Sequence, residues 1–404
     1  MPGRFRPWNN GLPASHAPGA VPVLGAPLMT PKIAKFLQAH TPATPCLVLD
    51  VDVVEQNFTA MRNAMPSAQI FYALKANPAP EILHRLVALG CGFDCASIEE
   101  INMCLEAGAE PAKLSFGNTV KKATAIAAAR AAGIDLYVFD CLAELEKIAL
   151  HAPGARVFCR LAVSSEGAVY PLSRKFGVST EVAGDLLRRA MDLGVVPWGL
   201  SFHAGSQQTR TWAHEVAIGQ VAMLFDELEA DGIKLGMINV GGGFPTEYLD
   251  RTPAIEVFAA RIARALTYHF GDSQPQLLVE PGRYLSGNAG VVVSEVVLVS
   301  QRDPADPLRW VYLDIGKFGG LIEAESNVIR YRITTPHDGT DDGPVIIAGP
   351  TCDSGDTLYD KLDYRLPMRL RDGDRVVLHN AGAYVTTYAA QSFNGFKPLE
   401  EYYL

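Results

Sequence analysis

Between about residues 50 and 285, short apolar runs alternate with amphipathic stretches, and this alternation most restricts what the chain can fold into. The amphipathic stretches have helical periodicity, and the apolar runs are bounded by Gly, Asn or Asp, as buried parallel strands are. The runs lie at 70–75, 92–97, 114–118, 135–140, 156–163, 198–205, 237–243 and 277–283. Eight strands that alternate with helices predict an α/β fold with a closed (β/α)8 barrel, and a doubly wound open sheet is the alternative.

After about residue 290 the pattern changes to short, Val-rich runs separated by turn signals such as Asp338-Gly339 and Asp372-Gly373. These runs lie at 291–300, 310–314, 329–334, 345–348, 375–378 and 385–388. They predict an antiparallel β domain, a sandwich or a small barrel, and the apolar run at 45–50 is expected to join it. We therefore expect a barrel over 50–285 and a β domain built from 29–49 and 286–404.

The composition excludes several classes of protein. The net charge of −9 argues against a nucleic-acid binder, and no apolar run is long enough to cross a membrane. The charge would suit a cationic substrate, although solubility alone accounts for it. Seven cysteines, without metal-ligand spacing, predict reduced thiols in a cytoplasmic protein and no metal site. Residues 1–28, rich in Pro, Gly and Ala, are expected to form a disordered extension.

Residues able to do chemistry end nearly every predicted strand. They are Lys75, Asp94, Asn118, Arg160, His203, Gly241-Gly242-Gly243, Glu280 and Arg283. Because barrel active sites lie at the C-terminal ends of the strands, we expect these residues to converge on one mouth. Among apolar neighbours, the amine of Lys75 is expected to lose its proton more easily and to attack a carbonyl; the alternative is an ordinary surface lysine.

Other residues fit an anionic, aromatic ligand. The three glycines can present N–H groups to an anion, and Arg283 beside them would complete a phosphate site, although a simple turn also explains the glycines. Glu280 could face a pyridine nitrogen or pair with Arg283. His203 could stack on an aromatic cofactor while Ser206 donates to its phosphate, or be structural. Cys352, in a polar loop beside an aspartate, could act as an acid or be incidental.

Eight motifs, in order over about residues 40–396, resemble the ornithine decarboxylases and bacterial lysine/ornithine decarboxylases, which share the alanine-racemase-like fold (fold type III) of pyridoxal-phosphate (PLP) enzymes. The motifs are Tyr72-Ala73-Leu74-Lys75-Ala76-Asn77, Phe93-Asp94-Cys95-Ala96-Ser97, Lys175-Phe176-Gly177, Ser201-Phe202-His203-Ala204-Gly205-Ser206, Gly241-Gly242-Gly243-Phe244-Pro245, Glu280-Pro281-Gly282-Arg283, Gly349-Pro350-Thr351-Cys352-Asp353 and Gly382-Ala383-Tyr384.

The resemblance implies a cofactor, pyridoxal 5′-phosphate, and a role for each matching residue. Lys75 would form the Schiff base with PLP, Glu280 would hold the pyridine nitrogen, and His203 would stack on the ring. The implied phosphate-binding residues are Ser206, Gly241, Gly242, Gly243, Gly282, Arg283 and Tyr384. The matching positions that line the cofactor and the reacting centre are Asp94, Glu100 and Arg160.

The resemblance also implies a head-to-tail homodimer with shared active sites. Cys352 of the partner subunit would reprotonate the α-carbon after CO2 leaves, and the partner's Asp353 would receive the distal amine of the substrate. Lys175 and Asp356 match a pair that bridges the interface in relatives.

The substrate-binding segment departs from the pattern of the animal enzymes. Phe318 stands near the position of a tyrosine, and Asn327 aligns with a second substrate-binding aspartate, for which Glu323 or Glu325 would compensate. The sequence of residues 318–321 is closer to that of the bacterial lysine/ornithine enzymes.

The resemblance therefore implies a carboxy-lyase of polyamine biosynthesis that converts L-ornithine to putrescine, with L-lysine to cadaverine as a second activity. A lysine-preferring enzyme and a diaminopimelate-type decarboxylase are alternatives within the fold, and a racemase is another. A non-catalytic regulator that binds a partner protein is the alternative from a different class, although such a protein has no need of the Lys75 and Arg283 set.

Overall fold

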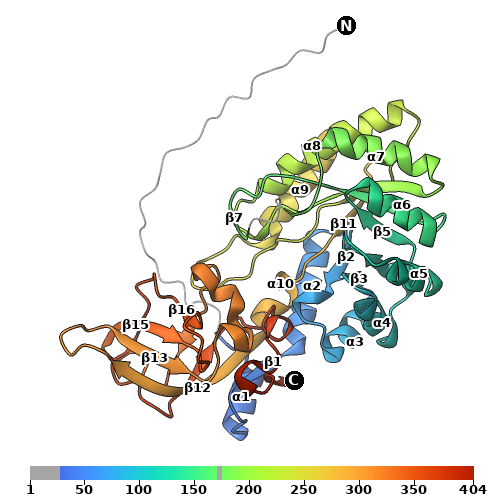
Figure 1. Ribbon diagram of the computed structural model, residues 1–404. Helices are drawn as coiled ribbons and strands as arrows, with labels where there is room; N and C mark the ends of the chain where they lie inside the picture. Colours follow the sequence, from blue (N-terminus) through green and yellow to red (C-terminus); the bar gives the residue numbers. More distant parts are fainter. Residues whose placement is uncertain (1–27, 171–174) are drawn as a thin grey trace, which may run out of the picture.

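The computed structural model describes residues 28–170 and 175–404, so the predicted disordered extension, apart from its last residue, lies outside the described residues. The chain forms a barrel of parallel strands and a curled β domain that lie side by side (Figure 1). Within the described residues, no helix has the length and apolar character to cross a membrane.

The barrel closes in the order β10-β11-β2-β3-β4-β5-β6-β8, which confirms the (β/α)8 prediction and excludes the open sheet. Its strands are β2 (Ala68–Ala73), β3 (Gly92–Cys95), β4 (Leu114–Phe116), β5 (Leu136–Phe139), β6 (Arg156–Leu161), β8 (Val196–Phe202), β10 (Met237–Asn239) and β11 (Gln276–Val279). Alternate strand residues such as Phe71, Val138 and Phe158 form a cluster separate from the residues that pack on the helices. Bulky side chains thus fill the interior, which places the site at the mouth.

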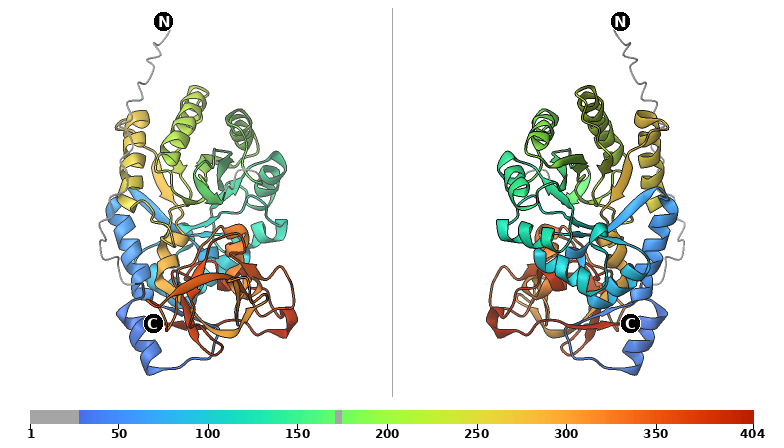
Figure 2. Two further views of the ribbon diagram at one scale, coloured as in Figure 1. Left: turned by 90° about the vertical axis from the view of Figure 1, so that its left-hand side faces the viewer. Right: turned by 90° about the vertical axis from the view of Figure 1, so that its right-hand side faces the viewer.

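Helices surround the strands, as the two further views in Figure 2 show. They are α2 (Val51–Ala64), α3 (Pro80–Ala88), α4 (Ile98–Glu106), α5 (Ala123–Ala131), α6 (Leu142–His151), α7 (Thr180–Asp192), α8 (Ala213–Ala230) and α9 (Ile255–Phe270). The final strand β11 leads only into the one-turn α10 (Arg283–Ser286). Helix α2 precedes the first barrel strand and packs on both α3 and α9, so it closes the ring of helices at this point.

The β domain is one curled sheet. Its strands are β1 (Cys46–Leu49), β12 (Gly290–Gln301), β13 (Arg309–Leu313), β14 (Ile333–Thr334), β15 (Asp342–Ala348), β16 (Thr357–Leu358), β17 (Arg365–Pro367), β18 (Arg375–Leu378) and β19 (Glu400–Tyr403). As expected, the run before the barrel joins this sheet, because β1 pairs with β12. Helix α1 (Pro31–Ala39) precedes β1.

Two expectations about the β domain are wrong in detail. The sheet is mixed, because β1 pairs in parallel with β19 and β13 in parallel with β15. Long connections such as 314–341 make parallel pairing feasible, and turn signals do not reveal it. The run at 385–388 is not a strand: Thr386–Tyr388 is a 3-10 helix that follows Tyr384, whose φ of 59° interrupts the extended backbone.

The β domain is tied to the barrel mouth by its last long loop. The amide N–H of Tyr384 donates to the carbonyl of Ala76 at 2.8 Å. The side-chain amide of Asn77 donates to the carbonyl of Gly382 at 3.1 Å. The segment that follows β2 is therefore fixed from both domains.

Candidate active site

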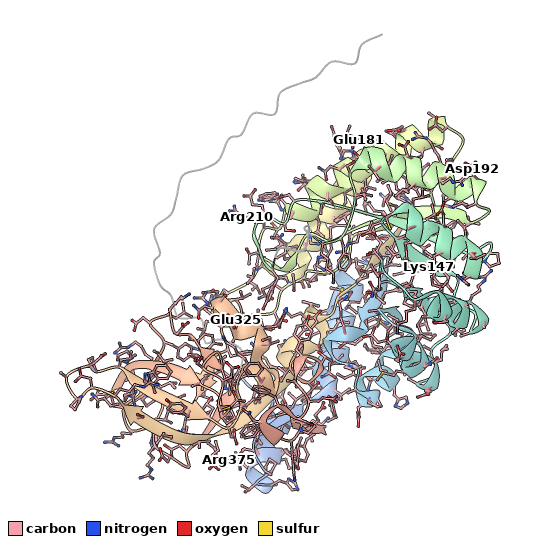
Figure 3. All side chains as sticks on the ribbon, viewed as in Figure 1. Lys147, Glu181, Asp192, Arg210, Glu325 and Arg375 are labelled. Carbon is pink, nitrogen blue, oxygen red and sulfur yellow. The ribbon has the colours of Figure 1, made fainter. Side chains whose placement is uncertain are left out.

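A cavity of about 600 Å³ opens at the C-terminal ends of the barrel strands, beneath the β domain. Most of the chemistry-bearing strand-end residues lie together in its wall. These are Lys75, Asn118, Arg160, His203, Ser206, Gly243, Glu280, Gly282, Arg283 and, from the β domain, Tyr384. The β domain adds Glu323, Glu325 and Tyr388. Figure 3 labels Glu325 at the edge of the β domain that faces the barrel.

Lys75 lies in a single 3-10 turn directly after β2, with its amine at the cavity. Its Nζ is 3.6 Å from Asp94 Oδ2, and Asp94 is buried and accepts a hydrogen bond from Ser115 Oγ at 3.2 Å. Burial opposes the positive charge, but Asp94, with Tyr384 and Glu280, holds the pKa of Lys75 above its usual range. The expected easy loss of the proton is therefore wrong for the chain alone, because acidic neighbours outweigh the apolar ones.

Glu280 follows β11 and faces the same cavity. The side-chain amide of Asn239 donates to its Oε1 at 2.5 Å. Burial, together with the nearby Asp94, raises the pKa of Glu280 to about 7. The alternative of a Glu280–Arg283 salt bridge is wrong, since Arg283 pairs with Glu323 instead. Glu280 is thus left as a carboxyl group whose proton a facing basic nitrogen can take.

The glycine run 241–243 is held by its carbonyl groups. The carbonyl of Gly241 accepts from Glu280 N–H at 2.8 Å, and that of Gly243 accepts from Gln208 N–H at 2.8 Å. The carbonyl of Gly242 lies 3.2 Å from Nε2 of a buried histidine. Within the described residues, the N–H groups of Gly242 and Gly243 have no acceptor. Such N–H groups form a cradle for an anion.

The glycines cannot be replaced without displacing the backbone around them. A Cβ at Gly242 would lie 2.3 Å from the carbonyl oxygen of Glu280, and one at Gly243 would lie 2.2 Å from that of Gly205. At Gly282 it would lie 3.0 Å from the hydroxyl of Tyr384. The close approach explains why this stretch of the sequence contains no side chains.

Arg283 completes the cradle and is fully enclosed. Its guanidinium binds both carboxylate oxygens of Glu323, at 2.7 and 2.5 Å, and donates to the hydroxyl of Tyr248 at 2.8 Å. It lies 3.5 Å from Ser206 Oγ and 4.7 Å from the ring centre of Tyr384. Its buried Nε has no partner among the described residues, which leaves one N–H for a ligand anion.

The surroundings of Glu323 favour Arg283 as its partner over the predicted contact with the substrate. Its carboxylate is nearly enclosed, with 6% of the side chain exposed, and both oxygens are taken by Arg283. Its backbone carbonyl accepts a hydrogen bond from the hydroxyl of Tyr170 at 3.1 Å. Glu325 is the more open carboxylate at the cavity, with 56% of its side chain exposed and an ion pair to Lys317.

His203 and Arg160 complete the barrel side of the cavity. Nδ1 of His203 accepts from Gly205 N–H at 3.0 Å. Burial, reinforced by Arg160 and Lys75, holds the pKa of His203 well below its usual value, so its ring is neutral where it lines the cavity. The guanidinium of Arg160 lies 5.3 Å from the ring centre of Phe176, and burial lowers its pKa.

Among the predicted site residues that do not line the cavity are Asp94, Gly241 and Gly242, which adjoin residues of its wall, and Cys352, Asp353 and Phe318, which lie away from it. Cys352 and Asp353 are exposed on their loop, and Phe318 packs on Phe393 with ring centres 4.7 Å apart, beside a second cavity of about 370 Å³. The predicted intersubunit partner Asp356 is buried, and its carboxylate accepts from Lys317 N–H at 2.7 Å. The amine of Lys175 lies over the ring of Phe176, 4.8 Å from its centre.

Sequence reasoning missed residues that hold this site without lining it. Asn239 donates to Glu280 and accepts from Gly241 N–H at 2.8 Å, so it connects the carboxylate to the glycine run. A polar residue inside an otherwise apolar strand was the available signal. Tyr248 and His214 carried no such signal, because each acts through a residue distant in sequence. Among residues 28–170 and 175–404, no three His, Cys, Asp or Glu side chains are grouped as metal ligands.

An amine on a barrel wall, a buried carboxyl group and an N–H and guanidinium cradle define an enzyme that binds a phosphorylated aromatic aldehyde. Lys75 fits the aldehyde, Glu280 a ring nitrogen, and the Gly242–Arg283 cradle the phosphate. The chain belongs to the pyridoxal-dependent decarboxylases: residues 51–287 match the family described as "Pyridoxal-dependent decarboxylase, pyridoxal binding domain". Its cofactor is pyridoxal 5′-phosphate.

Relatives cover nearly the whole chain. It is 36% identical to the lysine/ornithine decarboxylase of Selenomonas ruminantium over 91% of each protein. It is 32% identical to the ornithine decarboxylase of Schizosaccharomyces pombe, over 88% of this chain and 82% of that protein. The crystal structure of the Vibrio vulnificus lysine/ornithine decarboxylase complexed with cadaverine superimposes with a TM-score of 0.82 at 31% identity, covering 93% of this chain and 99% of the other.

Proposed function

We propose that the chain decarboxylates L-ornithine to putrescine and, as a second substrate, L-lysine to cadaverine, and that it does so in the cytoplasm as a homodimer with shared active sites. The observation that carries this proposal is the division of the site. The groups suited to the cofactor share one cavity of the chain, while Cys352 and Asp353 are exposed on a loop outside it. The names of the relatives from Selenomonas and Vibrio support the substrate class.

Each residue has a task that its surroundings allow. Bound PLP supplies a conjugated ring that takes up the electron pair left on the α-carbon when the bond to the carboxylate breaks and CO2 leaves. The Lys75 amine provides the covalent attachment, and the buried carboxylate of Asp94 lies beside it as its counter-ion. Glu280 would hold the ring nitrogen in its protonated form, and His203 would stack on the ring. The thiol of Cys352 of the partner subunit then delivers a proton to the α-carbon, which yields the amine.

The distal amine of the substrate would be held by carboxylates. Because Arg283 occupies both oxygens of Glu323, we assign this task to Asp353 of the partner subunit and to Glu325. Among the described residues, Glu325 forms an ion pair with Lys317 and accepts a hydrogen bond from Ser326 Oγ at 3.5 Å, and its carboxylate is open enough to receive an incoming amine. Ornithine and lysine differ by one methylene, which is worth about 1–3 kcal/mol of discrimination. Both are therefore expected to react.

The test is CO2 release from ornithine, lysine, arginine and diaminopimelate side by side, with PLP added. We expect ornithine and lysine to react, and Lys75→Ala protein to release no CO2 and to lack the visible absorption band of the Lys75–cofactor linkage. A preference for diaminopimelate would contradict the assignment of carboxylates to the distal group. An absorption band without CO2 release from any of the four would favour the non-catalytic alternative.

A further inference from the structure

His214 lies beneath the glycine run, outside the cavity, in the first turn of α8. Its side chain is fully buried among three phenylalanines. It stacks on Phe244, with ring centres 5.1 Å apart and planes 4° from parallel, and meets Phe258 edge-on at 5.9 Å. In such an apolar enclosure a phenylalanine would pack as well and would bury no polar atom.

The imidazole makes one polar contact. Nε2 lies 3.2 Å from the carbonyl oxygen of Gly242, and the buried Nδ1 has no partner within the described part of the chain. Burial lowers the pKa of His214 to about 4, so the ring is neutral near pH 7. Because a carbonyl only accepts, the proton must be on Nε2. Nδ1 is then a buried acceptor without a donor, and this unfavourable arrangement indicates that the contact with Gly242 has a use beyond packing.

The geometry of the peptide bond shows what this contact does. In a trans peptide the carbonyl of Gly242 and the N–H of Gly243 point in opposite directions. A carbonyl fixed toward the core therefore directs the N–H of Gly243 to the other side, and Gly243 lines the cavity. The carbonyls on either side, of Gly241 and Gly243, are bound by backbone N–H groups of Glu280 and Gln208. Of the three glycine carbonyls, that of Gly242 is the one held by a side chain among the described residues.

We propose that His214 is a positioning residue of the phosphate site, which fixes the Gly242–Gly243 peptide so that its N–H faces the phosphate of the cofactor. The inference rests on the cofactor and is independent of which amino acid is the substrate. It predicts that His214 matters for a ligand that carries a phosphate and not for the same aldehyde without one.

The test compares PLP with pyridoxal, which lacks the phosphate but has the same aldehyde for Lys75. Protein stripped of cofactor is titrated with each, and the absorption band of the Lys75 linkage gives the two affinities. His214→Phe keeps the stacking and removes the donor, whereas His214→Gln keeps an N–H near the position of Nε2. Phe258→Leu disturbs the same aromatic cluster without touching the glycine run and is the matched control. Thermal shifts with inorganic phosphate provide a second readout.

We expect His214→Phe to weaken PLP about tenfold, as the loss of one oriented donor would, and to leave pyridoxal unchanged. In His214→Phe the rise in unfolding temperature caused by inorganic phosphate should be smaller than in the wild type. The unfolding temperature without ligand should not decrease. His214→Gln should recover most of the PLP affinity. Phe258→Leu should lower the unfolding temperature and keep the ratio of the two affinities.

Three results would overturn the proposal: an unchanged PLP-to-pyridoxal ratio in His214→Phe, an equal weakening of both aldehydes, or a His214→Gln protein as impaired as His214→Phe. A wild-type protein that binds neither aldehyde would overturn it together with the cofactor assignment. Wild-type protein that binds PLP but decarboxylates no basic amino acid would remove the proposed substrate and leave the role of His214 standing.

Discussion

Replacement of Glu323 by Gln distinguishes between two roles of this residue. The structure indicates that it compensates the charge of Arg283, whereas its sequence position suggested that it binds the substrate. Both side chains are nearly enclosed, at 3% and 6% exposure, and the pair is bidentate. Removing one charge from a buried pair leaves the other uncompensated and costs about 3–5 kcal/mol. With an unfolding entropy of about 2.1 cal/mol/K per residue over 404 residues, the unfolding temperature should fall by about 4–6 °C.

The loss should depend on the ligand. A bound phosphate returns negative charge to Arg283, so the unfolding temperatures of the variant and the wild type should approach each other when PLP or inorganic phosphate saturates both. By linkage, the variant must then bind phosphate more tightly than the wild type does. The matched control is Glu325→Gln, which removes an ion pair with Lys317 whose carboxylate is 56% exposed, so its loss should lower the unfolding temperature less than the loss of the enclosed Glu323 carboxylate. Differential scanning calorimetry of the wild type and both variants, each with and without phosphate, measures these unfolding temperatures.

Two outcomes would refute this reasoning. An unfolding temperature that Glu323→Gln leaves unchanged without ligand would mean that Glu323 does not compensate Arg283. A large rise in the KM for ornithine, with phosphate affinity unchanged, would return Glu323 to the substrate side and favour the original sequence interpretation. The KM of Glu325→Gln is expected to rise more than that of Glu323→Gln, because Glu325 is the more open carboxylate.

Three further predictions use other parts of the site. The pKa of Glu280 is raised from 4.5 to about 7, so between these pH values the folded protein without cofactor holds a proton that the unfolded chain has lost. The free energy of unfolding should therefore decrease as the pH rises through this window. In denaturant titrations, Glu280→Gln should make this decrease smaller. Mixed Lys75→Ala and Cys352→Ala proteins should regain part of the activity if sites are shared, and no recovery despite proven subunit exchange would contradict that. Cys352→Ala alone should slow turnover and produce pyridoxamine phosphate and an aldehyde; clean amine at an unchanged rate would refute the proton-donor role.

The barrel and the position of its site could be predicted because both follow from local pattern. Apolar runs of strand length that alternate with stretches of helical periodicity predict the parallel barrel. The residues at the C-terminal ends of these strands are then expected to meet at the mouth of the barrel. Lys75, His203 and Glu280 could therefore be placed in one cavity before any pairing was known. Helix α2 does not follow from the strand–helix repeat, because it lies ahead of the first barrel strand, although it closes the ring of helices.

The partner of each charge could not be predicted, because it is set by contacts between segments far apart in the chain. The sequence suggested Glu280, three residues away, as a partner of Arg283. The structure pairs Arg283 with Glu323 instead, which lies forty residues away. The one-turn helix α10 begins at Arg283, so the guanidinium turns toward the β domain while Glu280 remains at the end of β11. The prediction that Lys75 loses its proton easily was wrong for the same reason. The pKa of Lys75 depends on Asp94, which belongs to the adjacent strand β3.

The loop that carries Cys352 supplies the structural reason to expect a second chain at each site. It is held firmly: the carboxylate of Asp356 accepts from Thr351 Oγ1 at 2.8 Å and from Lys317 N–H at 2.7 Å, and Asn394 Oδ1 accepts from Cys352 N–H at 3.0 Å. These bonds fix the loop with Cys352 exposed and outside the cavity wall. A thiol held in this way can protonate an α-carbon only if a second chain places its own cavity against the loop. Asp356 would then serve the dimer by shaping this loop.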